Sequence, residues 1–279
     1  MSDSIEAISR IGRPRKSSSE PQTSLRRRGR RSIVAIGAAL CLKLTVVCPL
    51  KAQELDWAIP LGATAGGITT DGVGNSYVTG TFSGTVVFGA GEVNETTMTS
   101  AGGGDLFVSK YDPNGALVWA RRAGGISLDQ GSGIATDSSG SVYVTGGYSN
   151  TAIFGADEPN QTVLGTPLGD KGTFVAKYMP DGTLAWAKRN LNSERFMESV
   201  GIATDSAGNS YVTGVFLGTA TFGPGDARST TLTSFDFSGF VARYDSSGAL
   251  AWAVQRANGT IFGAIGEAPI ATDGPEIAM

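Results

Sequence analysis

One feature limits the possible folds of this chain more than any other: a stretch of fourteen residues occurs three times in nearly the same form. The copies are GITTDGVGNSYVTG at 67–80, GIATDSSGSVYVTG at 133–146 and GIATDSAGNSYVTG at 201–214. A motif that occurs once can be a site. A motif that returns after 66 and then 68 residues indicates an internally repeated fold.

Two further stretches recur with the same spacing. The longer one is FVSKYDPNGALVWA at 107–120, FVAKYMPDGTLAWA at 174–187 and FVARYDSSGALAWA at 240–253. The shorter one is TVVFG at 85–89, TAIFG at 151–155 and TATFG at 219–223. Three stretches in a fixed order define a structural repeat of about 66 residues.

Within each repeat, β-branched and aromatic runs are separated by short turn sequences. In the second copy, IAT and VYVTG lie on either side of a turn from Asp137 to Gly140. An Asp at the first turn position can accept backbone N–H groups, and a Gly at the fourth can take a positive φ. FVAKY and LAWA are joined in the same way, so we expect four strands per repeat, paired as two hairpins.

Two sets of recurring residues are therefore predicted to be structural. The turn set is Asp71, Gly74, Asp137, Gly140, Asp205, Gly208, Asp112, Gly115, Asp181, Gly182, Asp245 and Gly248. The core set is Trp57, Trp119, Trp186, Trp252, Tyr111, Tyr178 and Tyr244. In FVAKY the two-residue period puts Phe174, Ala176 and Tyr178 on one face, which a single sheet cannot bury. Repeats must then stack on one another, and radially stacked four-stranded sheets are the blades of a β-propeller.

The repeated residues also carry a family resemblance. GIATDSSGSVYVTG, followed by TAIFG, FVAKYMPDGTLAWAK and a glycine-rich link, resembles the bacterial seven-bladed β-propeller repeat family, known as SBBP repeats. The resemblance covers residues 54–279. It implies a propeller in an exported or cell-surface bacterial protein, and it implies no agreed catalytic activity.

The predicted fold is therefore an all-β propeller built of four-stranded antiparallel blades. Blades are expected at about 66–123, about 132–190 and about 200–257, within a repeat domain at 53–279. ELDWA at 54–58 matches only a last strand, and a partial blade at 268–279 stops at IATDGPEIAM. Because propellers usually have at least four blades, we expect an incomplete propeller, either a fragment or a chain that closes with another chain.

Residues 1–52 have a different composition. They hold eleven of the 22 Lys and Arg residues, and SLRRRGRR precedes an apolar run at 32–50 and a small residue at Ala52. A basic, disordered n-region, an apolar h-region and a small exit residue predict a signal peptide, by the Sec or the Tat route. A retained membrane anchor is the alternative, although Lys43 interrupts the run. The expected location is secreted, periplasmic or at the cell surface.

Composition excludes several kinds of site. The chain has no His, and its two cysteines, Cys41 and Cys48, lie in the predicted signal. His-dependent triads, His-ligated zinc and thiolate chemistry are therefore excluded from the mature chain. Residues after position 52 carry eleven basic and 22 acidic groups, a net charge of −11, which argues against nucleic acid as a partner. We predict no catalytic, cofactor-binding or metal-binding residue.

Two alternatives for the recurring acidic residues remain open. Asp71, Asp137, Asp205 and Asp273 can be interpreted as calcium ligands or as general acids and bases, but one per blade keeps them apart. A propeller-type carbohydrate lyase or hydrolase would need an acidic or Arg cluster that breaks the repeat symmetry. The nearest candidate is the charged link NSERFMES at 192–199.

The segments that differ between repeats are the better indication of function. Residues 90–104, 156–172 and 224–238 vary while their flanks agree. Loops on a rigid scaffold commonly carry binding specificity. We therefore expect a non-enzymatic scaffold for adhesion or binding, whose partner is an unknown protein or glycan, with membrane contact only through the signal or an N-terminal anchor.

Overall fold

The computed structural model describes residues 62–166, 171–192, 196–256, 271–273 and 276–278, all within the compact unit Gln53–Met279. The predicted signal peptide and Trp57 lie outside these residues. The described residues form strands and turns and contain no helix, so the predicted all-β antiparallel class is confirmed. Among them there is accordingly no helix of the length and apolarity needed to span a membrane.

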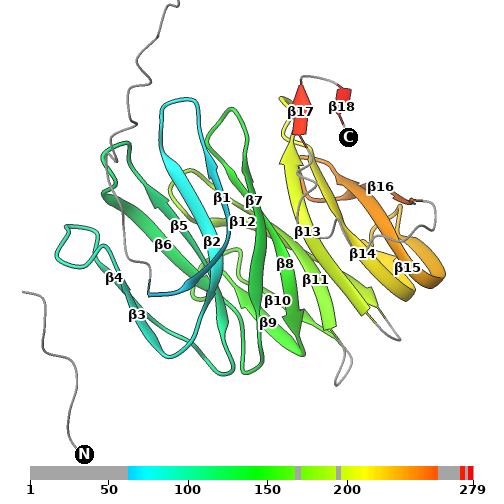
Figure 1. Ribbon diagram of the computed structural model, residues 1–279, viewed down its shortest axis with the longest axis horizontal. Coiled ribbons are helices and arrows are strands. Elements are labelled where there is room, and N and C mark those ends of the chain that lie inside the picture. Colours follow the sequence, from blue (N-terminus) through cyan, green and yellow to red (C-terminus); the bar gives the residue numbers. More distant parts are fainter. Residues whose placement is uncertain (1–61, 167–170, 193–195, 257–270, 274–275, 279) are drawn as a thin grey trace, which may run out of the picture. The chain divides into compact units, whose positions relative to one another are not determined.

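The first repeat contains one four-stranded antiparallel sheet and one separate hairpin. The sheet consists of β1 (Thr64–Thr70), β2 (Ser76–Phe82), β5 (Asp105–Tyr111) and β6 (Leu117–Ala123), in the order β1-β2-β5-β6. Between β2 and β5 the chain forms the hairpin of β3 (Thr85–Phe88) and β4 (Thr96–Thr99). Figure 1 shows the hairpin beside the end of its sheet.

The second repeat has the same plan. Its sheet strands are β7 (Gln130–Thr136), β8 (Val142–Ser149), β11 (Lys171–Tyr178) and β12 (Leu184–Asn192). Its hairpin strands are β9 (Thr151–Phe154) and β10 (Thr162–Gly165).

In the third repeat the hairpin is continuous with the sheet. The strands are β13 (Phe196–Thr204), β14 (Ser210–Phe222), β15 (Thr230–Tyr244) and β16 (Leu250–Gln255). The long strands β14 and β15 pair from Ser210–Tyr244 to Phe222–Thr230. The short strands β17 (Ala271–Asp273) and β18 (Glu276–Ala278) pair with each other, and β17 lies beside β13.

The strand pairing differs from the expected pair of separate hairpins. The second and third strands of each repeat also pair, as β2–β5, β8–β11 and β14–β15, so each repeat forms one continuous antiparallel sheet. The stretches TVVFG, TAIFG and TATFG begin the hairpins that connect these two strands. In β3 exposed and buried side chains alternate, as expected for a strand with one covered face.

Neighbouring repeats are joined by backbone bonds as well as by side chains. The inner strands β1, β7 and β13 lie in sequence, each against the next. Residues Asn190–Asn192 at the end of β12 pair with Ala220–Phe222 of β14, and Gly124 forms an antiparallel bridge with Ile153 at the preceding junction. The last strand of one repeat thus reaches the hairpin of the following repeat.

Stacking buries both faces of the middle sheet, not only the face predicted from the two-residue period. Phe174, Ala176 and Tyr178 of β11 belong to one hydrophobic cluster, while Val175 belongs to a second cluster built mainly from the third repeat. All four side chains are almost completely buried. The core therefore continues from repeat to repeat, and the sheets form its layers.

Candidate functional site

The recurring acidic residues lie where the first and second strands of each repeat are connected. Asp137 Oδ1 accepts hydrogen bonds from the N–H groups of Ser139 (2.9 Å) and Ser141 (3.0 Å), and its Oδ2 accepts from the Tyr143 hydroxyl (3.0 Å). Lys177 Nζ lies 3.6 Å from the same Oδ2. Gly140 closes the turn at a φ of +79°. The carboxylate is thus fully engaged by its own turn and by the next strand.

The equivalent residues in the other repeats make the same contacts with their own turns and with a tyrosine. Asp71 accepts from Asn75 and Tyr77, and Asp205 accepts from Asn209 and Tyr211. Burial alone would raise the pKa of each carboxyl, but the hydrogen bonds outweigh burial, so the pKa of Asp71, Asp137 and Asp205 is lowered. The closing glycines Gly74 and Gly208 also have positive φ, +90° and +75°.

The turns between the third and fourth strands are similar, with one difference in the second repeat. Asp112 Oδ1 accepts the N–H groups of Asn114 and Ala116, and Asp245 Oδ1 accepts those of Ser247 and Ala249. Asp181 occupies the third turn position, where Met179 takes the first, and it accepts from Thr183. Its short side chain therefore binds the residue after the turn.

The tryptophans connect one repeat to the next. Trp119 Nε1 donates to the Pro180 carbonyl at 3.0 Å, and Trp186 Nε1 donates to the Ser246 carbonyl at 3.2 Å. The rings lie against Gly182 and Gly248, where an added Cβ would come within 2.7 Å and 2.6 Å of ring atoms. Gly115, Gly182 and Gly248 all have a φ between +82° and +84°. Trp252 is half-buried and packs near Tyr211, with ring centroids 6.3 Å apart.

The three core tyrosines occupy the ends of their strands inside the sheets. Tyr111, Tyr178 and Tyr244 are almost completely buried. Burial raises the pKa of each phenol. The Tyr244 hydroxyl donates to Asn190 Oδ1, which belongs to the preceding repeat. These contacts make the tyrosines part of the packing between strands.

The geometry keeps the recurring acids separate. Asp71, Asp137 and Asp205 each lie in a different turn, and the described residues contain no group of three or more His, Cys, Asp or Glu side chains placed to hold a metal ion. Side-chain positions at Asp273 lie outside the description.

A recurring acidic position was missed in the sequence. Each hairpin turn has an acid three residues after its Gly: Glu92 Oε2, Glu158 Oε2 and Asp226 Oδ2 accept the N–H of Leu117, Leu184 and Leu250, the first residue of the fourth strand. The signal was present as FGAGE, FGADE and FGPGD, in segments that differ almost everywhere else. The variable segments are therefore attached to the scaffold at one shared point.

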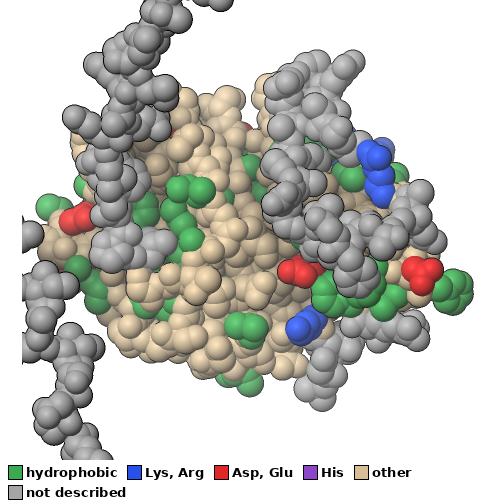
Figure 2. All heavy atoms as spheres, in the orientation of Figure 1, with side chains coloured by type: hydrophobic (Ala, Val, Ile, Leu, Met, Phe, Trp, Pro, Cys, Tyr) green, Lys and Arg blue, Asp and Glu red, His purple; other side chains and the backbone are tan. Residues whose placement is uncertain are grey.

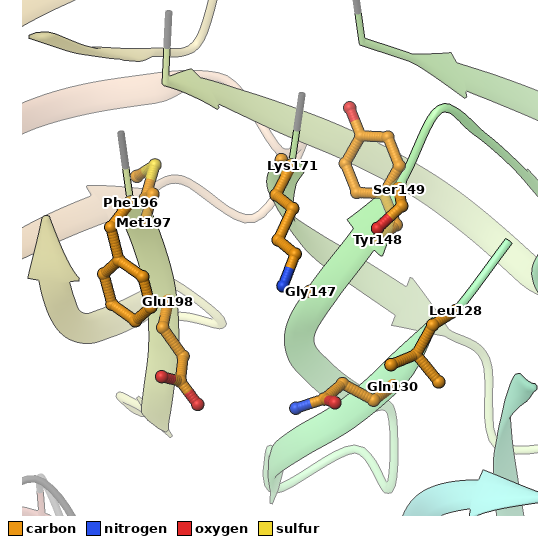
Figure 3. Close-up of a pocket in the computed structure, with 10 residues that line it drawn as sticks. Leu128, Gln130, Gly147, Tyr148, Ser149, Lys171, Phe196, Met197 and Glu198 are labelled. Carbon is orange, nitrogen blue, oxygen red and sulfur yellow. The ribbon is translucent and has the colours of Figure 1, made fainter. Parts of the chain in front are cut away.

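The opposite end of the sheets carries a groove. The groove consists of two adjoining hollows. The first has a volume of about 230 Å³ and lies where the starts of β7, β11 and β13 and the end of β8 converge. Figure 3 shows Lys171 of β11 between Phe196, Met197 and Glu198 of β13 on one side and Leu128 and Gln130 on the other. Leu128, Lys171 and Glu198 are at least partly exposed, and Tyr148 and Met197 form buried parts of the wall.

A second hollow of about 360 Å³ adjoins the first and shares Gln130 and Glu198 with it. It extends to Thr64 at the start of β1. Thr64, Gln130 and Glu198 stand at the same position of three successive inner strands, three residues before the shared glycine of each repeat. The repeat therefore presents three different polar side chains side by side along one groove.

Lys171 and Glu198 are the charged residues among those that line the groove. On the face seen in Figure 2, charged side chains are sparse and hydrophobic ones lie in separate patches. Neither Lys171 nor Glu198 forms an ion pair with another residue that the structure describes. Phe196 packs edge-to-face on Phe237 at a centroid distance of 5.5 Å. The groove thus offers a cation, an anion, an amide and an aromatic side chain, the mixed chemistry typical of polar ligand sites.

The charged link singled out at 192–199 is partly described. Phe196, Met197 and Glu198 line the groove, whereas residues 193–195 lie outside the described residues. A second asymmetric cluster was not recognised in the sequence: Asp105, Arg122 and Asp129, at the junction of the first and second repeats. Both carboxylates are fully buried. The other repeats carry Gly172 and Ser238 in place of Asp105, which was the available signal.

Residues 118–155 match the SBBP family, described as a beta-propeller repeat, and this segment runs from β6 to β9 across the first junction. The chain is also 28% identical over 184 residues to an uncharacterised WD repeat-containing protein of Acanthamoeba polyphaga mimivirus. That alignment covers 58% of this chain and 13% of the viral protein, so the chain spans a small part of that relative's length.

Proposed function

This chain carries a repeat of the SBBP beta-propeller family, and from that premise we propose that it is an exported or cell-surface, non-enzymatic scaffold that binds a ligand in the groove. Each repeat is then a propeller blade, since four-stranded antiparallel sheets stacked face to face are the blades of such folds, including WD repeats. The ligand is a protein segment or a glycan.

One observation carries this proposal. The residues that recur between repeats lie at the turn end of the sheets, where they bind their own turns, while the groove end carries different side chains at equivalent positions. Thr64, Gln130 and Glu198 illustrate this divergence on a shared backbone. Rigid scaffolds with variable loops commonly bind through the variable end.

The first test measures binding by the secreted chain on glycan and peptide arrays. Replacing Glu198→Gln together with Lys171→Met removes both charges of the groove and is expected to weaken retention of the best array ligand roughly tenfold or more. Asn114→Ala, at an exposed turn of the opposite end, is the matched control and is expected to bind like the parent. Equal binding by parent and groove variant would refute the proposal.

A carbohydrate-active enzyme is the alternative, and the same material distinguishes it. A glycosidase and lyase panel is run beside the array, because an enzyme turns its glycan over whereas a binding scaffold retains it. Turnover of a glycan that is not retained on the array would favour the enzyme over the binding scaffold. Export is tested separately by determining the amino terminus of the protein from the culture medium or periplasm, where a start near Ala52 or Gln53 is expected.

A further inference from the structure

Two buried acids meet beside the groove. Asp105 is the first residue of β5, Asp129 immediately precedes β7, and neither side chain is exposed. They lie on either side of Gly124: a Cβ added there would be 2.9 Å from Asp129 Oδ2 and 3.0 Å from Asp105 Oδ1. The two carboxyl groups therefore face the same small volume in the interior.

The available hydrogen-bond donors satisfy this pair only in part. Asp129 Oδ2 accepts the Gly125 N–H at 2.7 Å, and its Oδ1 accepts the Ser149 N–H at 3.3 Å. Asp105 Oδ2 accepts from Arg122 Nη1 and from the Ala101 N–H. Asp105 Oδ1 is buried and has no hydrogen-bond partner among the described residues.

Charge balance at the pair favours one proton. Two buried carboxylates would face a single cation, Arg122, and like charges in a poorly solvated site cannot both ionise without a large penalty. The pKa of Asp129 is raised to about 7, chiefly by burial; the Gly125 and Ser149 N–H groups and Arg122 oppose this rise, and the Asp105 charge adds to it. Burial raises the pKa of the Tyr148 phenol in β8 to about 12, and the Asp129 charge adds to this rise.

The pair holds a segment that forms one wall of the groove. Asp129 stands between Leu128 and Gln130, both of which line the hollow, and its acceptor Oδ1 binds the backbone of Ser149, a third lining residue. Backbone bonds also hold the segment 124–129: Gly124 exchanges two with Ile153, and the Ile126 carbonyl accepts the Gly103 N–H. The Asp129 N–H donates to the Gly104 carbonyl, and Asn150 Nδ2 donates to Ser127 Oγ at 2.7 Å. Ile126, in the middle of the segment, is 78% exposed.

We propose that Asp105 and Asp129 form a proton-dependent latch that fixes the segment 124–129 against the groove, and that loss of the Asp129 proton loosens this wall. With one proton present, the pair carries a single negative charge opposite Arg122. When that proton leaves to solvent, two carboxylates repel each other across Gly124, and the segment moves outward to solvate them. This regulation rests on the proposed function, because the wall that moves is the wall of the proposed binding groove.

The next junction supplies an internal comparison. At the positions of Asp129 and Asp105 it has Met197 and Gly172, so no ionisable pair occurs there. Met197 is buried, and its sulfur accepts a hydrogen bond from the Thr173 hydroxyl at 3.8 Å. A change with pH is therefore expected at the wall formed by 124–129 and not at the wall formed by Phe196 and Met197.

The test uses a cysteine as a reporter of segment motion, without any ligand. Residues 53–279 contain no cysteine, so Leu128→Cys in a full chain that also carries Cys41→Ser and Cys48→Ser reports the segment alone. Its alkylation rate is divided by that of Val93→Cys, on a fully exposed hairpin turn, which cancels the intrinsic pH dependence of thiols. We expect this ratio to rise roughly threefold or more around a midpoint near pH 7.

Two further variants make the result specific. Asp129→Asn should leave the ratio flat, and Asp105→Asn should move the midpoint to lower pH because one repelling charge is removed. A flat ratio in the parent, or an unchanged rise in Asp129→Asn, would overturn the latch. If Asp129→Asn does not fold, the chemical shifts of the Gly125 and Ser149 amides in the unmodified chain are followed against pH. Both are expected to change with one midpoint near pH 7, and the absence of such a change would overturn the latch.

The experiment on the latch and the experiment on the proposed function can fail independently of each other. The alkylation assay contains no ligand, so a flat ratio leaves array binding and its loss in the Glu198→Gln and Lys171→Met variant untouched. Conversely, absence of array binding leaves the pH-dependent ratio intact.

Discussion

The two ends of these sheets are built from the same backbone, yet they use their side chains in opposite ways. At the turn end, equivalent residues in different repeats make equivalent contacts, as Asp71, Asp137 and Asp205 do with their own turns and with a Tyr six residues on. At the groove end, equivalent positions hold Thr64, Gln130 and Glu198, and each charged lining residue has uncharged counterparts in the other two repeats.

The difference has a physical origin. A tight turn with a positive-φ closing residue accepts few residue types, and its Trp partner in the adjacent repeat restricts them further. The groove end has no such constraint, because its side chains project from strand ends into a hollow. The comparison therefore predicts large effects on stability at the turn end, small ones at the groove end, and the reverse for binding.

The largest effect is expected for Gly182→Ala. The new Cβ would lie 2.7 Å from the Trp119 ring and would be held at a φ of +84°, so steric overlap and backbone strain act together. We expect a loss of about 3 kcal/mol in the free energy of unfolding, measured with urea. Gly91→Ala is the control, since Gly91 has a φ of +81° and open space around it, and should lose only about 1 kcal/mol. Equal losses would mean that the Trp contact contributes nothing.

A smaller loss is expected for Asp137→Ala. The change removes the acceptor of two turn N–H groups and of Tyr143, and also the partner of Lys177. A loss of about 2 kcal/mol follows, because hydrogen bonds to a charged group are stronger than neutral ones. Asp112→Ala, whose carboxylate binds only the N–H groups of its own turn, should lose less in the same urea titration. A larger loss at Asp112 would contradict this ranking.

The comparison also bears on the dependence of stability on pH. The lowered pKa of Asp71, Asp137 and Asp205 stabilises the fold above the unfolded pKa of 3.8, and this contribution is lost as the pH falls below it. Asp129 acts in the opposite direction: its pKa is raised to about 7, so stability decreases as the pH rises from about 4 through about 7.

Urea midpoints across this range should therefore pass through a maximum between about pH 4 and about pH 6. Asp129→Asn should remove the decrease on the neutral side and leave the acid side unchanged. A midpoint that rises steadily to neutral pH in the parent would show that Asp129 is ionised in the folded chain.

Much of the fold was accessible from short-range patterns in the sequence. Runs such as VYVTG and FVAKY became strands, and tight turns closed by Gly140 and Gly182 join each to a neighbouring strand, because turn geometry depends on four consecutive residues. The hairpins begun by TVVFG were not assigned in advance, since a four-residue strand carries little periodic signal. Asp181 and Gly182 lie in the predicted turn, and the structure adds that Met179 takes its first position.

The candidate site depends on contacts that no local pattern records. Lys171, Glu198 and Gln130 come together only because β11, β13 and β7 of two repeats converge at one end. Asp105 and Asp129 are 24 positions apart in the sequence, and they share one buried volume because the link between repeats passes through Gly124. Turn and strand chemistry acts over a few covalent bonds and is visible in the chain. Burial, charge proximity and the groove arise where stacked sheets meet, and they depend on how one repeat packs against the next.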